Sequence, residues 1–211
     1  MKKVLVTQRL DQNHSYYEIR QGLDIKLTEY IYACGFMPII VPFIKDVAEF
    51  IKQTKPAGLI LSGGNDLTQI NPINNLSIIR DNLELQTIQI CDDLQIPILG
   101  ICRGMQLILS VFDQKFKPLK DHVATRHSIK LKNNSLLSHY LSGQYVVNSY
   151  HNYGLLNCTN KCIEILGRCE HDNSIESIKH KTKNIYGIMW HPEREKKFDE
   201  NMLHLFKKVF D

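Results

Sequence analysis

The sequence has few of the features that mark membrane or secreted proteins. Its longest apolar stretch, residues 96–112, is interrupted by Arg103, so no membrane-spanning helix is expected. The apolar run at residues 4–6 is too short for the core of a signal peptide, and no small-residue cleavage site follows it. We therefore expect a cytoplasmic protein with no membrane association.

Paired cysteines of the Cys-x-x-Cys type are also missing. The six cysteines occupy positions 34, 91, 102, 158, 162 and 169. The simplest interpretation is that all of these cysteines except Cys102 are reduced and mostly buried thiols. The spacing of the last three cysteines and His171 does not match a structural zinc site, so we expect neither a metal nor a cofactor. The sequence assigns no role to His122, His127, Cys158, Cys162 or Cys169.

A strong charge bias is absent as well. The 211 residues carry 26 Lys and Arg against 22 Asp and Glu, and 43% of positions are hydrophobic, which is ordinary globular composition. The basic residues are scattered, so no nucleic-acid partner is expected, whereas a small anionic substrate is compatible with the charge. The length suits one domain spanning residues 1–211. The oligomeric state cannot be inferred from the sequence.

The first half of the chain alternates short apolar runs with longer amphipathic segments. This alternation predicts right-handed βαβ units, and hence an α/β fold with a parallel sheet covered by helices on both faces. Strands are predicted at residues 3–7, 37–41, 57–62 and 96–99, and helices at 18–34, 43–54, 80–94 and 104–112. Residues 71–77 are predicted to form a flexible loop.

The second half has a different pattern, with short β-type segments in succession. It predicts an antiparallel extension that makes the sheet mixed, followed by one amphipathic helix at about residues 197–210. The predicted strands are residues 128–131, 144–149, 163–166, 174–179 and 184–190, with a turn at Asp172-Asn173.

A glycine-flanked cysteine follows one of the buried strands. Cys102 has Gly100 two residues before it and Gly104 two residues after it, in the pattern of a nucleophile elbow between a strand and a helix. The helix N-terminus favours the thiolate form of Cys102, and the backbone N–H of Arg103 is a candidate oxyanion donor. The alternative is a buried core thiol between two packing glycines.

Two further segments complete a candidate site. An apolar strand ends in His191-Pro192-Glu193, where Glu193 can orient the ring of His191 as a base for Cys102. Gly63 and Gly64 follow another buried strand, where the backbone can approach a substrate and donate a second oxyanion N–H. The alternative for the first segment is a histidine at a strand end beside a solvated glutamate. The alternative for the second is a plain tight turn.

Taken together, these segments resemble the class I glutamine amidotransferase superfamily, and most closely its gamma-glutamyl hydrolase branch. The resemblance rests on residues 61–66, 80–84, 99–106, 147–151 and 190–193, in the family's order. It implies a flavodoxin-like fold and thiol attack on a gamma-glutamyl amide. It further implies that Cys102, His191 and Glu193 are catalytic and that Gly64 and Arg103 form the oxyanion hole.

The resemblance also implies a pocket for the glutamyl group. Its residues would be Gly63, Gln106, Ser149, Tyr150 and His151, although a structural role for His151 is equally compatible. Residues 112–117 replace the family's glycine-rich stretch, which argues against polyglutamate or polyamine substrates. Residues 7–10, 15–20, 63–67 and 148–153 resemble members of the branch that act on nucleotide-linked substrates. Arg9, and less strongly Arg20, could meet an anionic leaving group.

Three other functions remain open. The chain could be a glutaminase subunit that passes ammonia to a synthase partner, or a hydrolase of gamma-glutamyl polyamines or peptides. It could also be an inactive binding module, although the complete Cys-His-Glu set argues against that. The sequence alone does not identify the leaving group.

Overall fold

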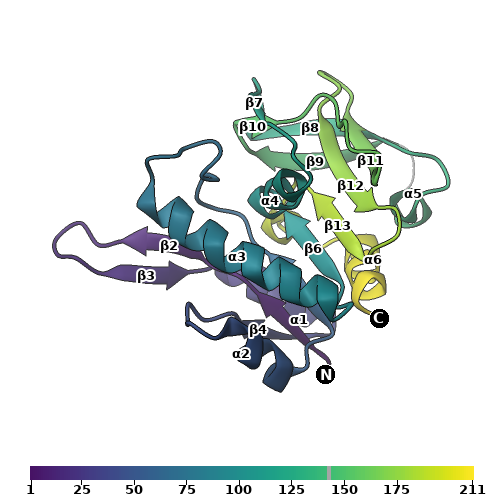
Figure 1. Ribbon diagram of the computed structural model, residues 1–211. Helices are drawn as coiled ribbons and strands as arrows, with labels where there is room; N and C mark the ends of the chain where they lie inside the picture. The colour runs from purple at the N-terminus through teal and green to yellow at the C-terminus, as the bar shows by residue number, and fades with distance from the viewer. Residues whose placement is uncertain (142–143) are drawn as a thin grey trace.

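The computed structural model describes residues 1–141 and 144–211 of the chain. Its centre is a nine-stranded sheet within these residues, in the order β4-β1-β5-β6-β13-β12-β11-β8-β9 (Figure 1). The parallel part consists of β4 (Met37–Ile40), β1 (Lys3–Val6), β5 (Gly58–Leu61), β6 (Ile98–Ile101) and β13 (Ile185–Ile188). The antiparallel part consists of β12 (Ile175–His180), β11 (Ile163–Cys169), β8 (Val123–Leu131) and β9 (Tyr145–Tyr150). The predicted parallel sheet with an antiparallel extension is confirmed.

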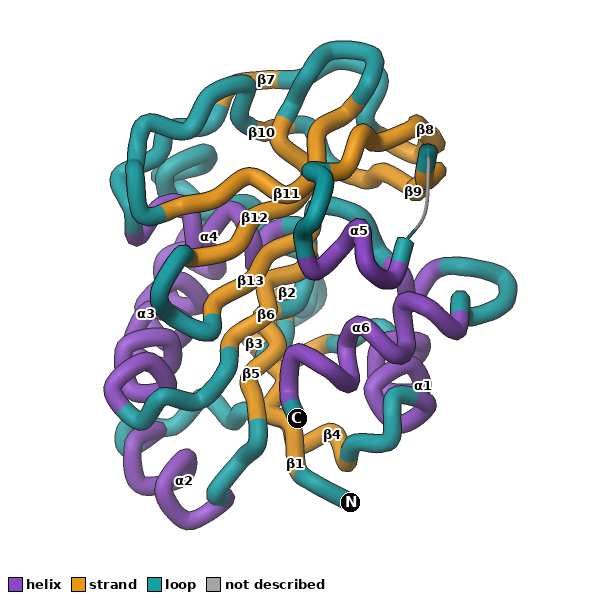
Figure 2. Tube along the Cα trace, turned by 90° about the vertical axis from the view of Figure 1, so that its right-hand side faces the viewer, coloured by secondary structure: helices purple, strands orange, loops and turns teal. Residues whose placement is uncertain are grey.

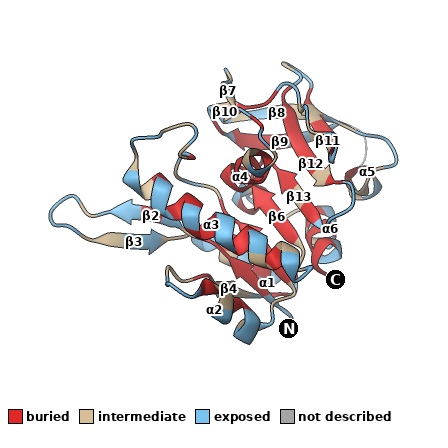
Figure 3. Cartoon of the chain, in the orientation of Figure 1, coloured by how far each residue is buried: buried red, intermediate tan, exposed pale blue. Residues whose placement is uncertain are grey.

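Helices cover both faces of this sheet (Figure 2). One face carries α2 (Val47–Thr54), α3 (Asn75–Asp93) and α4 (Arg103–Val111), and the other carries α1 (Ile25–Ala33), α5 (Leu136–Tyr140) and α6 (Glu200–Phe210). Alternation along β1 explains why both faces are apolar, because Val4 and Val6 pack with α1 and α6 while Leu5 packs with α2 and α3. The central strands are buried and the helices expose their outer sides (Figure 3).

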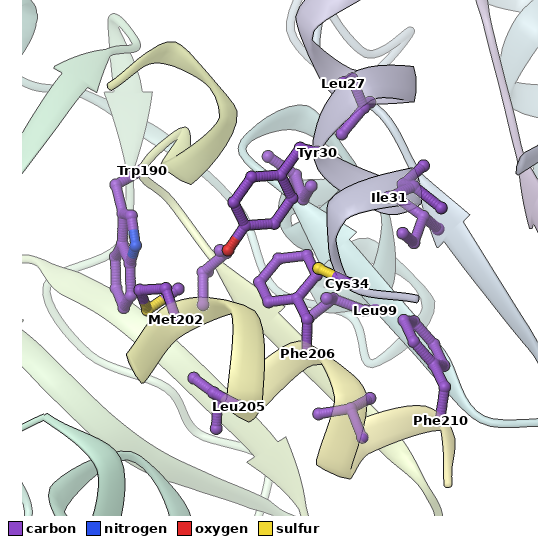
Figure 4. Close-up of a cluster of buried hydrophobic side chains, with 14 of the residues drawn as sticks. Leu27, Tyr30, Ile31, Cys34, Leu99, Trp190, Met202, Leu205, Phe206 and Phe210 are labelled. Carbon is purple, nitrogen blue, oxygen red and sulfur yellow. The ribbon is translucent and has the colours of Figure 1, made fainter. Parts of the chain in front are cut away.

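Aromatic packing fixes the end of β13, where the predicted histidine lies. Tyr30 of α1 makes edge contacts with Phe206 of α6 at a centroid distance of 5.0 Å, and Trp190 is buried in the same cluster (Figure 4). Trp190 is the residue before His191, so this cluster holds the backbone of the site in place.

The first predicted helix is partly wrong. Residues 18–34 do not form one helix, because Ile19–Gly22 is strand β3, which pairs with β2 (Arg9–Gln12) in a projecting hairpin. Helix α1 begins only at Ile25, where the Asp24 side chain accepts the Lys26 N–H and caps the helix. The sequence also did not predict the short pair β7 (Lys117–Pro118) and β10 (Tyr153–Gly154), nor helix α5.

Capping residues also explain the other shifted boundaries. Asn74 accepts backbone N–H groups at the start of α3, so the helix begins at Asn75 and the predicted loop at residues 71–77 is helical in its second part. Asp46 and Asp199 cap α2 and α6 in the same way and delay their starts relative to the prediction. Within the described ranges, no helix is both long and apolar enough to cross a bilayer.

Candidate active site

Three adjacent parallel strands deliver the predicted residues to one edge of the sheet. Gly63 follows β5, Cys102 follows β6 and His191 follows β13, and these strands are neighbours in the order β5-β6-β13. Because the carboxyl ends of parallel strands meet at one edge, residues far apart in the sequence come together there. The structure thus brings together the segments that the sequence pattern indicated.

Cys102 occupies a sharp turn between β6 and α4. Its φ of 52° lies in the left-handed region, which costs a non-glycine residue free energy and marks a functional turn. The flanking glycines allow the turn: a Cβ on Gly104 would lie 2.2 Å from the carbonyl oxygen of Leu61, and one on Gly100 would lie 2.4 Å from the backbone of Gly104. The backbone N–H of Cys102 donates to the carbonyl oxygen of Ile188 at 2.7 Å, which ties the turn to β13.

The thiol of Cys102 faces His191 in a buried environment. Burial disfavours the thiolate, but the charge and hydrogen bond of His191 outweigh it and lower the pKa of Cys102. Burial likewise opposes the imidazolium, yet Cys102 and Glu193 raise the pKa of His191 to about 9. Each group thus shifts the other toward its charged form, the thiolate of Cys102 and the imidazolium of His191.

A carboxylate and an amide hold the ring of His191. Its Nδ1 lies 2.7 Å from Oε1 of Glu193, an interaction in which the ring N–H donates to the carboxylate. The side-chain amide of Asn148, on β9, holds the backbone of His191. It accepts the His191 N–H at 2.8 Å and donates to the His191 carbonyl oxygen at 2.7 Å. The Tyr150 ring packs edge-on against His191 at 5.8 Å. The ring is thus oriented with Nε2 free to face the thiol.

The two backbone N–H groups predicted as oxyanion donors belong to residues that line the same cleft as Cys102. Arg103 is the first residue of α4, and Gly64 lies in the turn after β5 with a φ of 102°. Within the described residues, neither N–H has a protein acceptor. Free N–H groups next to a buried thiol are what an oxyanion hole requires.

A buried charge network connects the two turns. The guanidinium of Arg103 bonds to Asp81 and Glu84 of α3. Arg80, also on α3, bonds to Glu84 at 3.0 Å and donates to the carbonyl oxygens of Gly63 at 3.0 Å and Ser62 at 2.8 Å. Helix α3 therefore fixes the glycine turn and the cysteine turn relative to each other.

A cleft of about 430 Å³ opens above Cys102. The predicted pocket residues Gln106, Tyr150 and His151 line it, together with Gly64 and Arg103. The amide of Gln106 donates to the carbonyl oxygen of Tyr153 at 2.8 Å, which leaves its own oxygen available as an acceptor.

The side chain of Ser149 lies apart from the other predicted pocket residues, and its role in substrate binding stays a prediction. Ser149 is fully buried and does not line the cleft, because its hydroxyl donates to the carbonyl oxygen of His122 at 2.7 Å. Gly63 and Arg9 line a smaller adjacent pocket of about 40 Å³ instead of the main cleft. Gly63 still lies against the site, since a Cβ there would come within 2.8 Å of the His191 ring.

Two residues of this region were not predicted from the sequence. Arg194 lines both pockets, and its guanidinium lies over the Tyr150 ring at 4.6 Å. Arg194 directly follows the His191-Pro192-Glu193 motif, and this position in the sequence could have identified it as a site residue. Asn148 was missed because only the pairing of β9 with β8 brings it beneath His191.

The fold and the site together define a class I glutamine amidotransferase-like protein. The chain matches the profile of the Peptidase C26 family over residues 4–193, and it belongs to that family. It is 36% identical to the gamma-glutamyl-CDP-amidate hydrolase of Campylobacter jejuni over 208 residues, which cover 97% of this chain and 96% of that protein.

Two other comparisons are more distant. One subunit of the glutamine-hydrolysing GMP synthase of Methanococcus maripaludis is 30% identical over 154 residues, 73% of each chain. A solved structure of a GMP synthase-type subunit from Thermoplasma acidophilum superposes with a TM-score of 0.74 at 19% identity, covering 99% of this chain and 94% of that chain. This structural likeness supports the fold alone.

Proposed function

We propose that this chain is a cysteine-dependent hydrolase that releases glutamate from gamma-glutamyl-CDP-amidate, leaving cytidine diphosphoramidate, in capsule phosphoramidate biosynthesis. The observation that carries the proposal is the buried Cys102–His191–Glu193 arrangement, which suits thiol attack on an amide. The substrate is supported by the near full-length similarity to the Campylobacter jejuni hydrolase.

In the first step, the Cys102 thiolate attacks the gamma-carbonyl carbon of the bound substrate. The carbonyl oxygen becomes an oxyanion that accepts from the N–H groups of Gly64 and Arg103, and loss of one such donor costs about 3 kcal/mol. The His191 imidazolium gives its proton to the leaving nitrogen as the carbon–nitrogen bond breaks. A glutamyl thioester on Cys102 and a neutral His191 remain.

In the second step, neutral His191 takes a proton from a water molecule as that water attacks the thioester. The carbon–sulfur bond breaks, glutamate leaves, and the thiolate and imidazolium are restored. Glu193 keeps the ring in one tautomer through both steps, so that Nε2 always faces the reacting atoms. Gln106 and Tyr150 are proposed to bind the glutamyl group.

A glutaminase partner of a synthase is the second candidate function, because the GMP synthase subunit of Methanococcus maripaludis is 30% identical to the chain. A screen of gamma-glutamyl conjugates, scored by released glutamate, separates the two functions. The proposed hydrolase acts on gamma-glutamyl-CDP-amidate without a partner and acts poorly on glutamine. Preference for glutamine, with activity that rises when a synthase is added, would instead identify a glutaminase of this kind.

Arg9 provides a test of the charged leaving group. It lines the small pocket beside Gly64, and it is half-exposed in a pair with Asp11. We expect Arg9→Ala to raise KM for gamma-glutamyl-CDP-amidate about tenfold, because one hydrogen bond to a charged group is worth about 1.5 kcal/mol. Steady-state kinetics on this substrate and on a gamma-glutamyl amide with a neutral leaving group provide the measurement.

Arg20, the weaker of the two sequence candidates for this role, is an exposed arginine of the same hairpin that pairs with Glu18 and lines neither pocket, so it is the matched control. Arg20→Ala should leave KM for both substrates unchanged. Equal effects of Arg9→Ala on both substrates would remove Arg9 from leaving-group recognition.

The pH dependence follows from the two shifted groups. The reactive ion pair exists between the lowered pKa of Cys102 and the pKa of about 9 of His191. We therefore expect kcat/KM to rise as the pH passes the lowered pKa of Cys102 and to fall near pH 9, where His191 loses the proton it must donate. A profile of kcat/KM between pH 5 and about 10 measures this fall.

The variant Glu193→Gln tests whether His191 is the group that titrates at alkaline pH. It removes a carboxylate that helps to raise the pKa of His191, so the alkaline fall should move to lower pH and kcat should drop by about 10² to 10⁴. Glu200→Gln, an exposed change at the start of α6, is the control with an unchanged profile. An alkaline limb that stays in place in Glu193→Gln would argue against His191 as the titrating group.

A further inference from the structure

A second cluster of titratable side chains lies below the floor of the cleft, outside the proposed catalytic set. His122 precedes β8, His127 lies on β8, His151 follows β9 and Glu176 lies on β12. His122, His151 and Glu176 are buried, and Glu176 is completely inaccessible to solvent. An isolated carboxylate in this position is costly unless a cation compensates it.

The imidazole nitrogens converge on a single carboxylate oxygen. Oε1 of Glu176 lies 3.6 Å from Nδ1 of His122, 3.6 Å from Nε2 of His151 and 3.5 Å from Nε2 of His127. These separations are too long for good hydrogen bonds. They match the spacing of about 3.3–3.5 Å between ligand atoms that each lie roughly 2.1 Å from a tetrahedral Zn²⁺.

Several of these buried atoms have no other partner. Within the described residues, Nε2 of His151, Oε2 of Glu176 and both ring nitrogens of His127 lack hydrogen-bond partners. Buried polar atoms without partners are rare, and such a group indicates a missing partner such as an ion. The candidate ligand atoms of His122, His151 and Glu176 all lie within 4.8 Å of one another.

The outer nitrogens of two of the rings are bonded in the manner of metal-ligating histidines. Nε2 of His122 lies 3.0 Å from a carboxylate oxygen of Asp172, and Nδ1 of His151 lies 3.2 Å from the carbonyl oxygen of Tyr153. Each acceptor holds the ring proton on the outer side, so the inner nitrogen presents its lone pair to the cluster, where Nδ1 of His122 also lies 3.4 Å from the hydroxyl of Ser149.

We propose that Nδ1 of His122, Nε2 of His151 and the carboxylate of Glu176 form a binding site for Zn²⁺. Two imidazoles and one carboxylate are a common zinc ligand set, in which the fourth position is left to a water molecule. His151 also lines the Cys102 cleft, so the ion would fix a ring that borders the proposed substrate. The proposal of this zinc site does not depend on the proposed reaction.

Cys169 offers a competing arrangement that the test must separate. Its sulfur, with ring nitrogens of His122 and His127, forms a second group of atoms within 4.8 Å of one another. The ligand set proposed above is preferred because both of its histidines carry the outer hydrogen bonds, whereas neither ring nitrogen of His127 has a partner within the described residues.

The experiment is a metal titration of the full-length chain, first stripped with a chelator. Calorimetry with Zn²⁺ should give one site per chain, and Co²⁺ should give the visible absorption of a nitrogen- and oxygen-ligated tetrahedral ion without a thiolate charge-transfer band. Added Zn²⁺ should also raise the melting temperature, because the ion binds the folded state. Cys102→Ala and Cys169→Ser should both retain this binding, which excludes the active-site thiol and the competing arrangement.

Two substitutions test the ligand set itself. Glu176→Gln should abolish Zn²⁺ binding at micromolar concentration, and Asp172→Asn should weaken it by about 10- to 100-fold through the ring of His122. His171→Gln, an exposed histidine next to Asp172, is the matched control with unchanged affinity. Absence of stoichiometric binding by the wild-type chain would overturn the proposal without recourse to any variant. Binding that disappears in Cys102→Ala or Cys169→Ser, or a thiolate band with Co²⁺, would overturn it equally.

Discussion

Cys102→Ala is expected to abolish glutamate release while the protein stays folded. In the proposed mechanism the substitution removes the sulfur that attacks the carbonyl carbon, and within the described residues no other cysteine lines this cleft. The remaining oxyanion donors and substrate contacts cannot supply a covalent intermediate. We therefore expect kcat to fall by at least about 10⁴-fold, in line with nucleophile removal in other hydrolases.

Stability should change little in this variant. Alanine keeps the left-handed backbone of position 102, where φ is 52°, and the hydrogen bond from its N–H to Ile188. Thermal unfolding of the variant and the wild type should therefore give melting temperatures within a few degrees of each other. The matched control is Cys162→Ala, which removes an exposed thiol and should leave kcat unchanged.

Mass spectrometry adds an independent readout of the same prediction. Rapid acid quench of the wild type during turnover should trap a glutamyl adduct, and peptide mapping should place it on Cys102. The variant should form no adduct. Wild-type turnover by purified Cys102→Ala, or an adduct on another cysteine, would disprove the proposed mechanism.

The parallel half of the fold was predictable because its signals are local. Short apolar runs such as residues 57–62 are buried on both faces, and each is followed by an amphipathic helix. The cysteine turn was predictable for the same reason, since Gly100 and Gly104 must lie beside Cys102 for the backbone to turn. Strand order then placed His191 next to it.

Other features depend on contacts that the sequence does not display. Residues 19–22 have no strong strand pattern, and only pairing with β2 makes them a strand instead of the start of α1. The family resemblance placed Ser149 in the pocket together with Tyr150 and His151, whereas strand alternation turns the Ser149 side chain away from the cleft. The grouping of His122, His151 and Glu176 needs three separate strands to come together.

The largest stability effect is expected at Glu84. Its carboxylate is completely buried between the guanidinium groups of Arg80 and Arg103. Glu84→Gln keeps the shape but removes the charge, which leaves two buried cations with only Asp81 to compensate them. We expect the free energy of unfolding to fall by about 3–5 kcal/mol, measured by urea denaturation near pH 7.

Glu164→Gln is the matched control, because Glu164 pairs with Lys132 at the surface, where an ion pair contributes less than about 1 kcal/mol. The pH dependence provides a second criterion. Burial alone would raise the pKa of Glu84, but Arg103 and Arg80 outweigh it and lower the pKa below the ordinary 4.5. The stabilisation is therefore complete above that value and is lost as the pH falls through the lowered pKa.

Wild type and Glu84→Gln should accordingly differ most near neutral pH and converge in acid. The same loss should also affect the active site, because Arg80 positions the carbonyls of Ser62 and Gly63 and Arg103 carries a proposed oxyanion N–H. Any Glu84→Gln protein that folds should show a reduced kcat. If Glu84→Gln and Glu164→Gln lose equal stability, the network does not hold the two turns together, and packing of α3 against α4 must do so.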